Sequence, residues 1–375
     1  MDAIIIVTVI ALFLYSIFIF FTLYGLTAYK KINLNNDEKL GVSVIVAVRN
    51  GEKSLPNLLY CLSNQNYQGP FEIIIVDDQS NDGSVAIIQK YVKLNPHFKF
   101  QISKIGSDKL KQKKRALDAG IKMAKYDNLL FTDVDCHINP SWIKTMASYF
   151  TYYDYLVGYT YVNNKNDSNF VTIFQSIDLL MMMIVGKAFF GLGIPFGAIG
   201  QNQGFTKKLY KLSGGFESIQ SFIGDDTVFL QHCKKFTSKI GFVDDKNAYI
   251  QSRKEKEWKN LFFQRVRWAS DANKMWQVNW FFFCIFVITF VINSSILYSS
   301  IVSLVNYQLS NMVIGCMICK FLLEISIYSI GSYSLKVSIN YIYFIFWFII
   351  EIPYVVLMGV LSFFSHYLKW KGRRK

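Results

Sequence analysis

The stretch EIIIVDDQSNDGS at residues 72–84 decides the fold. Its first half is an apolar, β-branched run that ends in two carboxylates, Asp77 and Asp78, which is the pattern of a strand buried on both faces. Its second half carries the turn and capping residues with which a helix begins. A buried strand that leads directly into a helix is typical of a parallel sheet covered by helices.

The same alternation continues on both sides of this stretch. VSVIVAV at 42–48 and NLLFTDVD at 128–135 are two further apolar runs, and helical spacing follows the first and precedes the second. Strands that alternate with helices predict an α/β domain with a doubly wound, Rossmann-like parallel sheet over about residues 42–275. Ligands bind beyond the carboxyl ends of the strands in such a sheet, so the acidic residues at these ends are candidate site residues.

Two carboxylates that follow the third run are candidate metal ligands. Asp133 and Asp135 are separated by one residue, so in an extended backbone both side chains point to the same side. Two hard oxygen ligands together with a diphosphate are a normal environment for Mg²⁺ or Mn²⁺. A turn with a helix cap also explains these residues, because NPSW follows at 139–142.

Charged residues at the ends of the first two strands are candidate nucleotide contacts. Asp77 and Asp78 suit the base and ribose of a nucleotide, although helix capping accounts for the same acidic turn. Arg49 and Asn50 end the first strand and can reach the same pocket.

Later in the chain, Gly224–Asp225–Asp226 precedes a helical pattern. One of the two carboxylates can cap that helix, and the other is a candidate general base for an attacking hydroxyl. Lys113 or Lys114 can contact a phosphate, and a solvated helix start explains these two lysines equally well.

The two ends of the chain are apolar, which raises the hydrophobic content to 52%. Residues 4–24 contain no charge and are long enough to cross a bilayer, and three more candidate spans lie at about 279–305, 311–332 and 340–365. The middle one of these three carries Lys320 and Glu324 on one helix face. That pair is either a functional intramembrane site or a contact between helices.

The formal net charge is +14, but no motif of basic and stacked aromatic residues indicates nucleic-acid binding. Basic residues flank the apolar segments at Lys30–Lys31 and in the tail KWKGRRK at 369–375, as is typical of the cytoplasmic side of a membrane. The six cysteines are scattered, which predicts neither a disulfide framework nor a zinc site.

The segment QRVRW at 264–268 lies just before the second apolar span. Gln264, Arg267 and Trp268 share one helix face, and Arg265 lies roughly 100° away around the helix. A cation here can stabilise a departing diphosphate, and the indole can form a wall of an acceptor site. An amphipathic helix at the membrane interface is the alternative interpretation, and both can hold at once.

Taken in order, VSVIVAVRN, VDDQSNDGS, FTDVD, GDD and QRVRW resemble the membrane-bound, inverting family 2 glycosyltransferases with the GT-A fold. The resemblance covers about 42–275 and extends to ceramide glucosyltransferases and to processive polysaccharide synthases. It implies a nucleotide-sugar donor, Mg²⁺ or Mn²⁺ as the cofactor, and a segment at 200–217 that shapes the acceptor side. The site residues that it implies are Ala47, Arg49, Asn50, Asp77, Asp78, Lys113 and Asp133 for the nucleotide-sugar, Asp133 and Asp135 for the metal, and Asp226, Asp225, Gln264, Arg265, Arg267 and Trp268 for catalysis.

The sequence departs from this family at two positions. Ala47 replaces the usual proline of the first strand, and Asp225 replaces the usual glutamate before the catalytic aspartate. The second departure leaves open which member of the pair is the base, and we favour Asp226.

We expect an enzyme that transfers one sugar from a nucleotide-sugar, with UDP as the expected nucleotide, to a membrane lipid. The Met-rich and Gly-rich stretch at 177–200 is either a lipid-adapted surface or a buried core helix. A processive synthase that extends a β-linked glycan is the alternative, and a non-catalytic membrane subunit is the second alternative.

The predicted domains are an N-terminal transmembrane helix (1–29), a GT-A catalytic domain (30–255), an interfacial helix (256–278), C-terminal transmembrane helices (279–368) and a basic tail (369–375). We expect an integral membrane protein of the bacterial inner membrane with a cytoplasmic catalytic domain. Three full crossings after residue 275 would place the basic tail outside, against the positive-inside rule. We therefore expect that one C-terminal segment does not cross completely.

Overall fold

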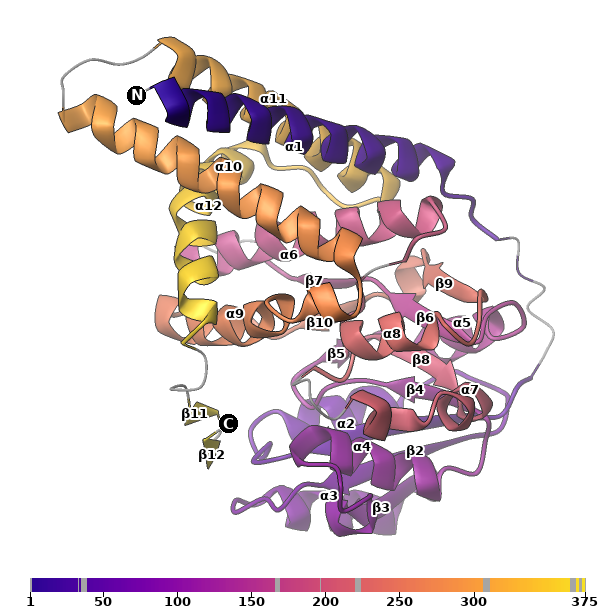
Figure 1. Cartoon of the computed structure of the whole chain (residues 1–375). Coiled ribbons are helices and arrows are strands. Elements are labelled where there is room, and N and C mark those ends of the chain that lie inside the picture. Colours follow the sequence, from indigo (N-terminus) through magenta and orange to yellow (C-terminus); the bar gives the residue numbers. More distant parts are fainter. Residues whose placement is uncertain are drawn as a thin grey trace. The chain divides into compact units, whose positions relative to one another are not determined.

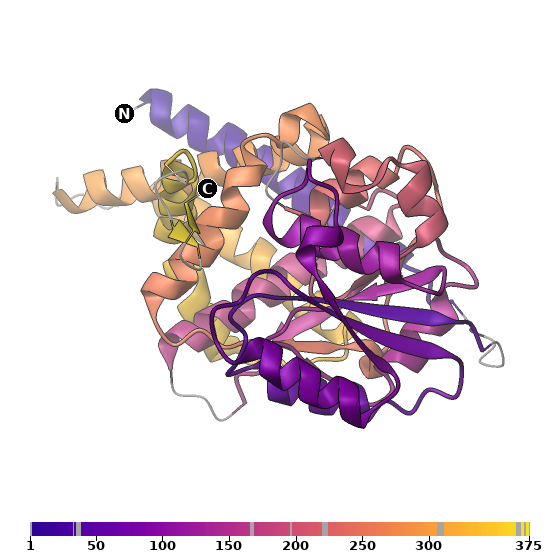
Figure 2. The same ribbon diagram turned by 90° about the horizontal axis from the view of Figure 1, so that it is seen from below.

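The computed structural model describes residues 2–32, 34, 39–165, 169–195, 197–219, 224–305, 311–364, 369–370 and 373–374. Phe196 and Ile223, which belong to two of the predicted motifs, and parts of the basic tail lie outside these residues. The chain forms two compact units (Figures 1 and 2). We call Lys31–Asn163 with Pro195–Arg253 the sheet unit, and Met1–Lys30 with Asn164–Ile194 and Lys254–Lys375 the helical unit.

The sheet unit contains a seven-stranded sheet in the order β3-β2-β1-β4-β8-β6-β9 and a three-stranded sheet in the order β5-β10-β7. The strands are β1 (Val42–Val48), β2 (Phe71–Asp77), β3 (Phe98–Ile102), β4 (Asn128–Phe131), β5 (His137–Ile138), β6 (Tyr155–Gly158), β7 (Thr160–Val162), β8 (Gln203–Thr206), β9 (Ile240–Val243) and β10 (Ile250–Ser252). The helices are α2 (Leu55–Ser63), α3 (Ser84–Leu94), α4 (Gln112–Met123), α5 (Trp142–Tyr149), α7 (Lys207–Leu212) and α8 (Thr227–Cys233), with short 3₁₀ turns between them.

The four strands β3-β2-β1-β4 are parallel, as predicted. The predicted α/β, Rossmann-like fold is confirmed, but the sheet also contains an unpredicted strand, β8, which runs antiparallel to both β4 and β6. The sheet is therefore mixed. β8 is short and includes Gln203, Gly204 and Thr206, so its sequence lacks the apolar run that marks a buried parallel strand.

Both faces of β1 are buried, which explains its unbroken apolar sequence. Val44 and Val46 join a core cluster with the leucines of α2. On the other face, Gly120 of α4 lies so close that an added Cβ would stand 2.5 Å from the Ile45 Cγ2 atom. This close approach of α4 fixes the position of its first turn, which carries Lys113.

Asn202 joins several segments of the sheet unit from a fully buried position. Its side-chain oxygen accepts a hydrogen bond from the Trp142 indole at 3.0 Å, and its amide nitrogen donates to the carbonyl oxygens of Tyr159 and Ala248 at 2.9 and 2.8 Å. The sequence resemblance placed this residue in an acceptor-side segment. In the structure, its buried side chain is fully hydrogen-bonded and connects these segments of the sheet unit.

The helical unit consists of α1 (Asp2–Ala28), α6 (Phe170–Gly191), α9 (Trp258–Ala272), α10 (Trp280–Val305), α11 (Asn311–Ser334) and α12 (Tyr341–Ser362), with a 3₁₀ turn at Met275–Gln277 and a short ladder of Lys369–Trp370 with Arg373–Arg374. Among the described residues, five helices are long and apolar enough to cross a membrane: α1, α6, α10, α11 and α12. Of these five helices, α6 is the one that the sequence did not predict as a span. It comes from the Met-rich stretch and packs against α1, α11 and α12. It is a buried helix, and the neighbours that bury it belong to the helical unit.

Charged residues of the apolar helices α11 and α12 form a buried network. The Lys320 ammonium lies 2.7 Å from Glu324 Oε1 and 2.7 Å from Glu351 Oε2. The Tyr15 hydroxyl donates to Glu324 Oε1 at 2.6 Å, and the Asn293 amide donates to Glu351 Oε1 at 3.1 Å. The network therefore connects α1, α10, α11 and α12, and buried charges are tolerated only in such paired arrangements.

We predict that Asn202→Ala lowers the free energy of unfolding by about 3 kcal/mol, because it leaves a buried indole N–H without its partner and removes a hydrogen bond from two carbonyl oxygens, of which that of Tyr159 keeps the bond from the Ile250 backbone. Thermal unfolding of the purified full chain in detergent measures the effect. Asn64→Ala is the matched control, since Asn64 is exposed and its amide donates to the Tyr60 carbonyl on the surface. A control change of about 0.5 kcal/mol or less is expected. An equally small effect of Asn202→Ala would contradict the prediction.

Candidate active site

Hydrogen bonds connect the loops that follow β1 and β2 at the carboxyl edge of the sheet. The Arg49 guanidinium donates to the Asp78 carbonyl at 2.8 Å, and the Asn50 side-chain oxygen accepts from the Asn81 backbone at 2.8 Å. Asn50 adopts a positive φ of 48°, which asparagine tolerates better than most residues. The predicted residues at these two strand ends therefore meet, and Arg49 and Asn50 shape the loop that carries the acidic turn.

Within that acidic turn, Asp77 and Asp82 have local roles. Both Asp77 carboxylate oxygens lie 3.3 Å from the Ser80 backbone nitrogen. Asp82 accepts from the backbone nitrogen and hydroxyl of Ser84, the first residue of α3. Burial opposes ionisation of Asp82, but these hydrogen bonds are stronger and lower its pKa. The capping interpretation thus holds for Asp82, while Asp77 and Asp78 end the strand as buried carboxylates.

Lys113 brings together two of the predicted acidic motifs. Its ammonium lies 2.9 Å from Asp133 Oδ1 and 3.1 Å from Asp225 Oδ2. Burial lowers the pKa of Lys113, but the two carboxylates outweigh burial and raise the pKa above its ordinary value. The neighbouring Lys114 is buried elsewhere and donates to the Ile219 carbonyl at 3.0 Å. Of the two candidate lysines, Lys113 is therefore the one that lies beside the acidic motifs, and its contact with a phosphate stays a prediction.

Asp226 completes this cluster and also caps a helix. Its Oδ1 atom accepts from the Thr227 backbone at 2.7 Å, at the start of α8, and its Oδ2 atom accepts from the Gly200 backbone at 3.0 Å. Burial, together with the adjacent Asp225 carboxylate, raises the pKa of Asp226 to about 6, against the opposing effect of Lys113. Asp226, the residue that we favour as the general base, is therefore also the residue that caps α8.

Gly200 is a site residue that motif reasoning did not single out. A Cβ atom at this position would stand 3.2 Å from the Lys113 ammonium and 3.4 Å from Asp226 Oδ2. The missing side chain therefore leaves the space between the lysine and the carboxylates open. Its signal in the sequence was the first glycine of GQNQGF, which pattern analysis alone does not distinguish from a turn glycine.

The predicted metal ligands Asp133 and Asp135 are both partly exposed at this edge. Their carboxylates are the hard oxygen donors that Mg²⁺ and Mn²⁺ prefer, so the donor chemistry fits. Among the described residues, no group of three or more His, Cys, Asp or Glu side chains converges as a complete metal site. The remaining ligands would have to be phosphate oxygens and water. Ala47 lies next to the end of β1 and pairs with Val76.

In the helical unit, the QRVRW segment lies on α9, and Arg265 is buried there although it is charged. The Arg265 guanidinium lies 2.7 Å from Asp178 Oδ2 on α6 and 4.2 Å from the centroid of the Trp268 ring. Gln264, Arg267 and Trp268 are partly exposed, in agreement with their predicted common face. Asp178, the partner of Arg265, was not predicted, because a single acidic residue in an apolar helix gives no hint of its partner.

Comparison with known proteins relates part of the chain to a family. Residues 43–212 match the family described as Glycosyl transferase family 2. The chain is 35% identical over 112 residues to a hyaluronan synthase of Pasteurella multocida, which covers 30% of this chain and 11% of the relative. It is 32% identical over 123 residues to a poly-beta-1,6-N-acetyl-D-glucosamine synthase of Staphylococcus aureus, which covers 32% of this chain and 28% of the relative. The chain thus matches only a small part of the length of these relatives.

One solved structure resembles almost the whole chain. It is the mannosyltransferase PcManGT of Pyrobaculum calidifontis in complex with GDP-Man and Mn²⁺, with a TM-score of 0.65 at 13% identity, over 97% of this chain and 99% of that one. At this identity the likeness shows the fold. The family match covers residues 43–212, less than half of the chain, and the chain has the GT-A fold with apolar helices towards both ends.

Proposed function

We propose that this chain is an inverting glycosyltransferase that moves one sugar from a UDP-linked donor to a membrane lipid. The observation that carries the proposal is the cluster of Lys113, Asp133, Asp225 and Asp226 at the carboxyl edge of the sheet. A nucleotide diphosphate needs cationic groups at the phosphates and a base near the acceptor, and this cluster supplies both. Catalysis in the cytoplasm of a bacterium, at the inner membrane, is part of the same proposal.

The reaction is a single displacement. The acceptor hydroxyl oxygen attacks the anomeric carbon, the bond from that carbon to the diphosphate oxygen breaks, and the configuration inverts. The hydroxyl proton passes to Asp226, and the nucleoside diphosphate leaves. We assign the base to Asp226 because it is partly exposed, whereas Asp225 is buried and paired with Lys113.

Asp77, Asp78, Arg49 and Asn50 are proposed to hold the nucleoside, and Lys113 is proposed to exchange its carboxylate partners for donor phosphate. Mg²⁺ or Mn²⁺, when bound by Asp133 and Asp135, would neutralise charge on the diphosphate. PcManGT, which shares the fold, was solved with Mn²⁺ and a nucleotide-sugar.

On α9, we propose that Gln264, Arg267 and Trp268 serve the diphosphate and the acceptor. Arg265 has a different setting, since it is buried and ion-paired with Asp178. We therefore propose that Arg265 orients α9 against α6 and acts on the reaction through its neighbours.

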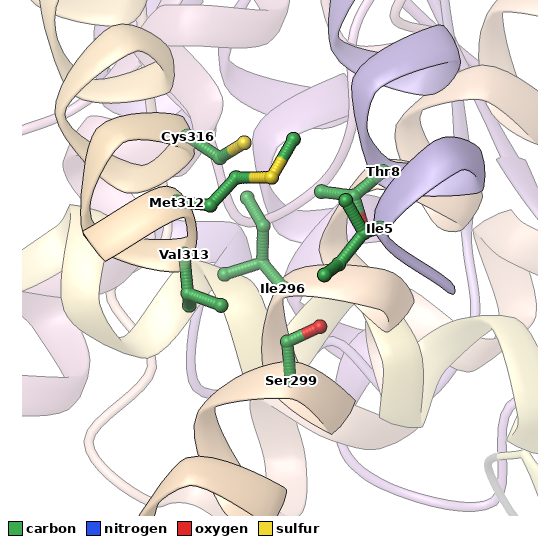
Figure 3. Close-up of a pocket in the computed structure, with 7 residues that line it drawn as sticks. All are labelled: Ile5, Thr8, Ile296, Ser299, Met312, Val313 and Cys316. Carbon is green, nitrogen blue, oxygen red and sulfur yellow. The ribbon is translucent and has the colours of Figure 1, made fainter. Parts of the chain in front are cut away.

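The lipid acceptor is proposed from the composition of the helical unit. On its α6 helix, Met182 is 45% exposed while Met181 and Met183 are buried, and flexible thioether side chains adapt to irregular apolar ligands. The pocket between α1, α10 and α11 is lined by Ile5, Thr8, Ile296, Ser299, Met312, Val313 and Cys316 (Figure 3). It has room for about one water molecule, so a glycan cannot pass through it.

A processive synthase is the second candidate function. The observation that favours it is the family of relatives, which are named hyaluronan, chondroitin and poly-N-acetylglucosamine synthases. The nature of the product distinguishes the two functions.

The base assignment predicts that Asp226→Asn lowers turnover by at least ~10²-fold while nucleotide binding stays near normal. Asn keeps an oxygen for the α8 cap but cannot accept the proton. In the wild type, turnover should fall as the pH drops through about 6, because protonated Asp226 is no longer a base. Rates of nucleoside diphosphate release, measured from pH 5 to 8, provide the test.

Asp245→Asn is the matched control, since Asp245 caps a 3₁₀ turn away from the cluster. An inactive Asp225→Asn variant beside an active Asp226→Asn variant would reverse the assignment.

The metal assignment predicts that Asp135→Asn and Asp133→Asn each weaken Mn²⁺ binding in the presence of UDP by at least about tenfold. Titration of the purified protein, followed by the electron paramagnetic resonance signal of free Mn²⁺, measures binding without reference to turnover. The exposed Asp108→Asn is the control, because Asp108 pairs with Arg115 on the surface. Unchanged Mn²⁺ binding in both variants, or full activity in EDTA, would remove the metal from the proposal.

The acceptor assignment predicts one discrete glycolipid. Membranes that contain the enzyme should transfer a radiolabelled sugar into a species that partitions into organic solvent and migrates as a single band. A product of high mass that grows with time would support the synthase instead. Asp226→Asn membranes provide the background for both measurements.

A further inference from the structure

The helices α10 and α11 form an antiparallel hairpin in the helical unit. At the end where they are joined, Ser300 of α10 lies 3.9 Å from the Met317 sulfur of α11, and both helices line the pocket in Figure 3. The first residue of α10, Trp280, and the last residue of α11, Ser334, are therefore at the opposite, open end of the hairpin. Each helix is long enough to cross a bilayer.

The helix α1 runs beside this hairpin. Its residues Ile5 and Thr8 line the same pocket at the joined end. Near its other end, an added Cβ on Gly25 would stand 2.2 Å from the Ala188 carbonyl oxygen of α6. The same part of α6 reaches the open end of the hairpin, because Lys187 donates to the Ser334 carbonyl at 2.9 Å and Phe189 packs against Phe281. The end of α1, the start of α10 and the end of α11 thus lie together at the open end of the hairpin.

The helix α12 begins near that same level. The Tyr328 hydroxyl, in the last two turns of α11, accepts from the Asn340 backbone at 3.0 Å, and its ring stacks on Phe344 at 4.8 Å. Ten residues after its start, α12 reaches the middle of the hairpin, where Glu351 meets Lys320 and Asn293. At 1.5 Å per residue, Lys320 lies about 21 Å from the end of α11, roughly half of the helix length.

From this midpoint α12 does not continue towards the joined end. An added Cβ on Gly359 would stand 2.5 Å from the Phe290 ring, which is closer to the start of α10 than Asn293 is. At the last residue of α12, the Ser362 hydroxyl accepts from the Asn273 amide at 2.8 Å, and Asn273 precedes α10 in the chain. Figure 1 shows α12 crossing the direction of α10. Both of its ends therefore lie in the open half of the hairpin.

The buried network and a proline explain why α12 does not continue from the middle of the hairpin towards its joined end. Glu351 is fixed to Lys320 and Asn293, and Pro353 removes a backbone donor two residues later. The exposed side of α12 is apolar and includes Ile342, Ile349 and Phe363, which are 77%, 63% and 70% exposed. Acyl chains of one membrane leaflet can cover this side, as they would cover the outer faces of α10 and α11.

We propose that α12 is a re-entrant helix, so that the chain crosses the membrane three times, through α1, α10 and α11. The chain belongs to the sheet unit both before Asn164 and after Ile194, so the segment that contains α6 begins and ends on one side of the membrane. The C-terminal tail then lies on the side where α11 ends and where the sheet unit is attached. This agrees with its basic sequence and shows which of the predicted spans does not cross. The inference is independent of the transferase activity.

Cysteine accessibility in intact cells tests this proposal on the full chain. In a background in which the six native cysteines are replaced by serine, single cysteines are placed by Lys336→Cys before α12 and by Arg374→Cys after it. Ser310→Cys, between α10 and α11, is the control for the other side. A membrane-impermeant maleimide should label Ser310→Cys in intact cells. It should label the other two variants only after permeabilisation.

The decisive comparison is between the two positions that flank α12. Equal protection of Lys336→Cys and Arg374→Cys, with Ser310→Cys labelled, supports the re-entrant helix. Labelling of Arg374→Cys in intact cells while Lys336→Cys stays protected would show that α12 crosses, and would overturn the proposal. Equal labelling of Ser310→Cys and Lys336→Cys would also overturn it, because the hairpin itself would not cross.

Discussion

The Lys113 ammonium, held between Asp133 and Asp225, is the interaction on which the site depends. It joins the start of α4, the turn after β4 and the approach to α8, which are far apart in sequence. Each of these segments would otherwise bring like charges together, since Asp133, Asp225 and Asp226 share one edge of the sheet. A single partly exposed cation makes their approach tolerable, and the close packing of α4 on β1 through Gly120 holds it in place.

The sequence was a good guide where local pattern and burial coincide. The apolar runs at 42–48 and 72–76 became strands, and the polar and charged residues at their ends, Arg49 and Asn50 after the first and Asp77 and Asp78 after the second, lie at the predicted edge. It was a poor guide where partners are distant in sequence. The antiparallel β8 has no apolar run, and the choice between Lys113 and Lys114 depends on the three-dimensional path of the chain around 219 and 225.

The same contrast holds for the apolar helices. Hydropathy identified α1, α10, α11 and α12 as candidate spans, because each has the required length and composition. It cannot show that Lys320 meets Glu351 from another helix, or that Arg265 meets Asp178, since these pairs are separated by 31 and 87 residues. Pairing decides whether a buried charge is tolerated, and pairing is a property of the tertiary fold.

The helix α6 belongs to the helical unit although its sequence is inserted between two halves of the sheet unit. This interleaving limits how the protein can be dissected. A fragment that begins after α1 and ends before α9 keeps every strand of the sheet but also keeps α6, whose apolar window is 78% buried by neighbours in the intact chain. Such a fragment would expose that surface to water and aggregate. A soluble version therefore requires excision of α6 and a new linker from Asn163 to Pro195, in addition to removal of the terminal helices.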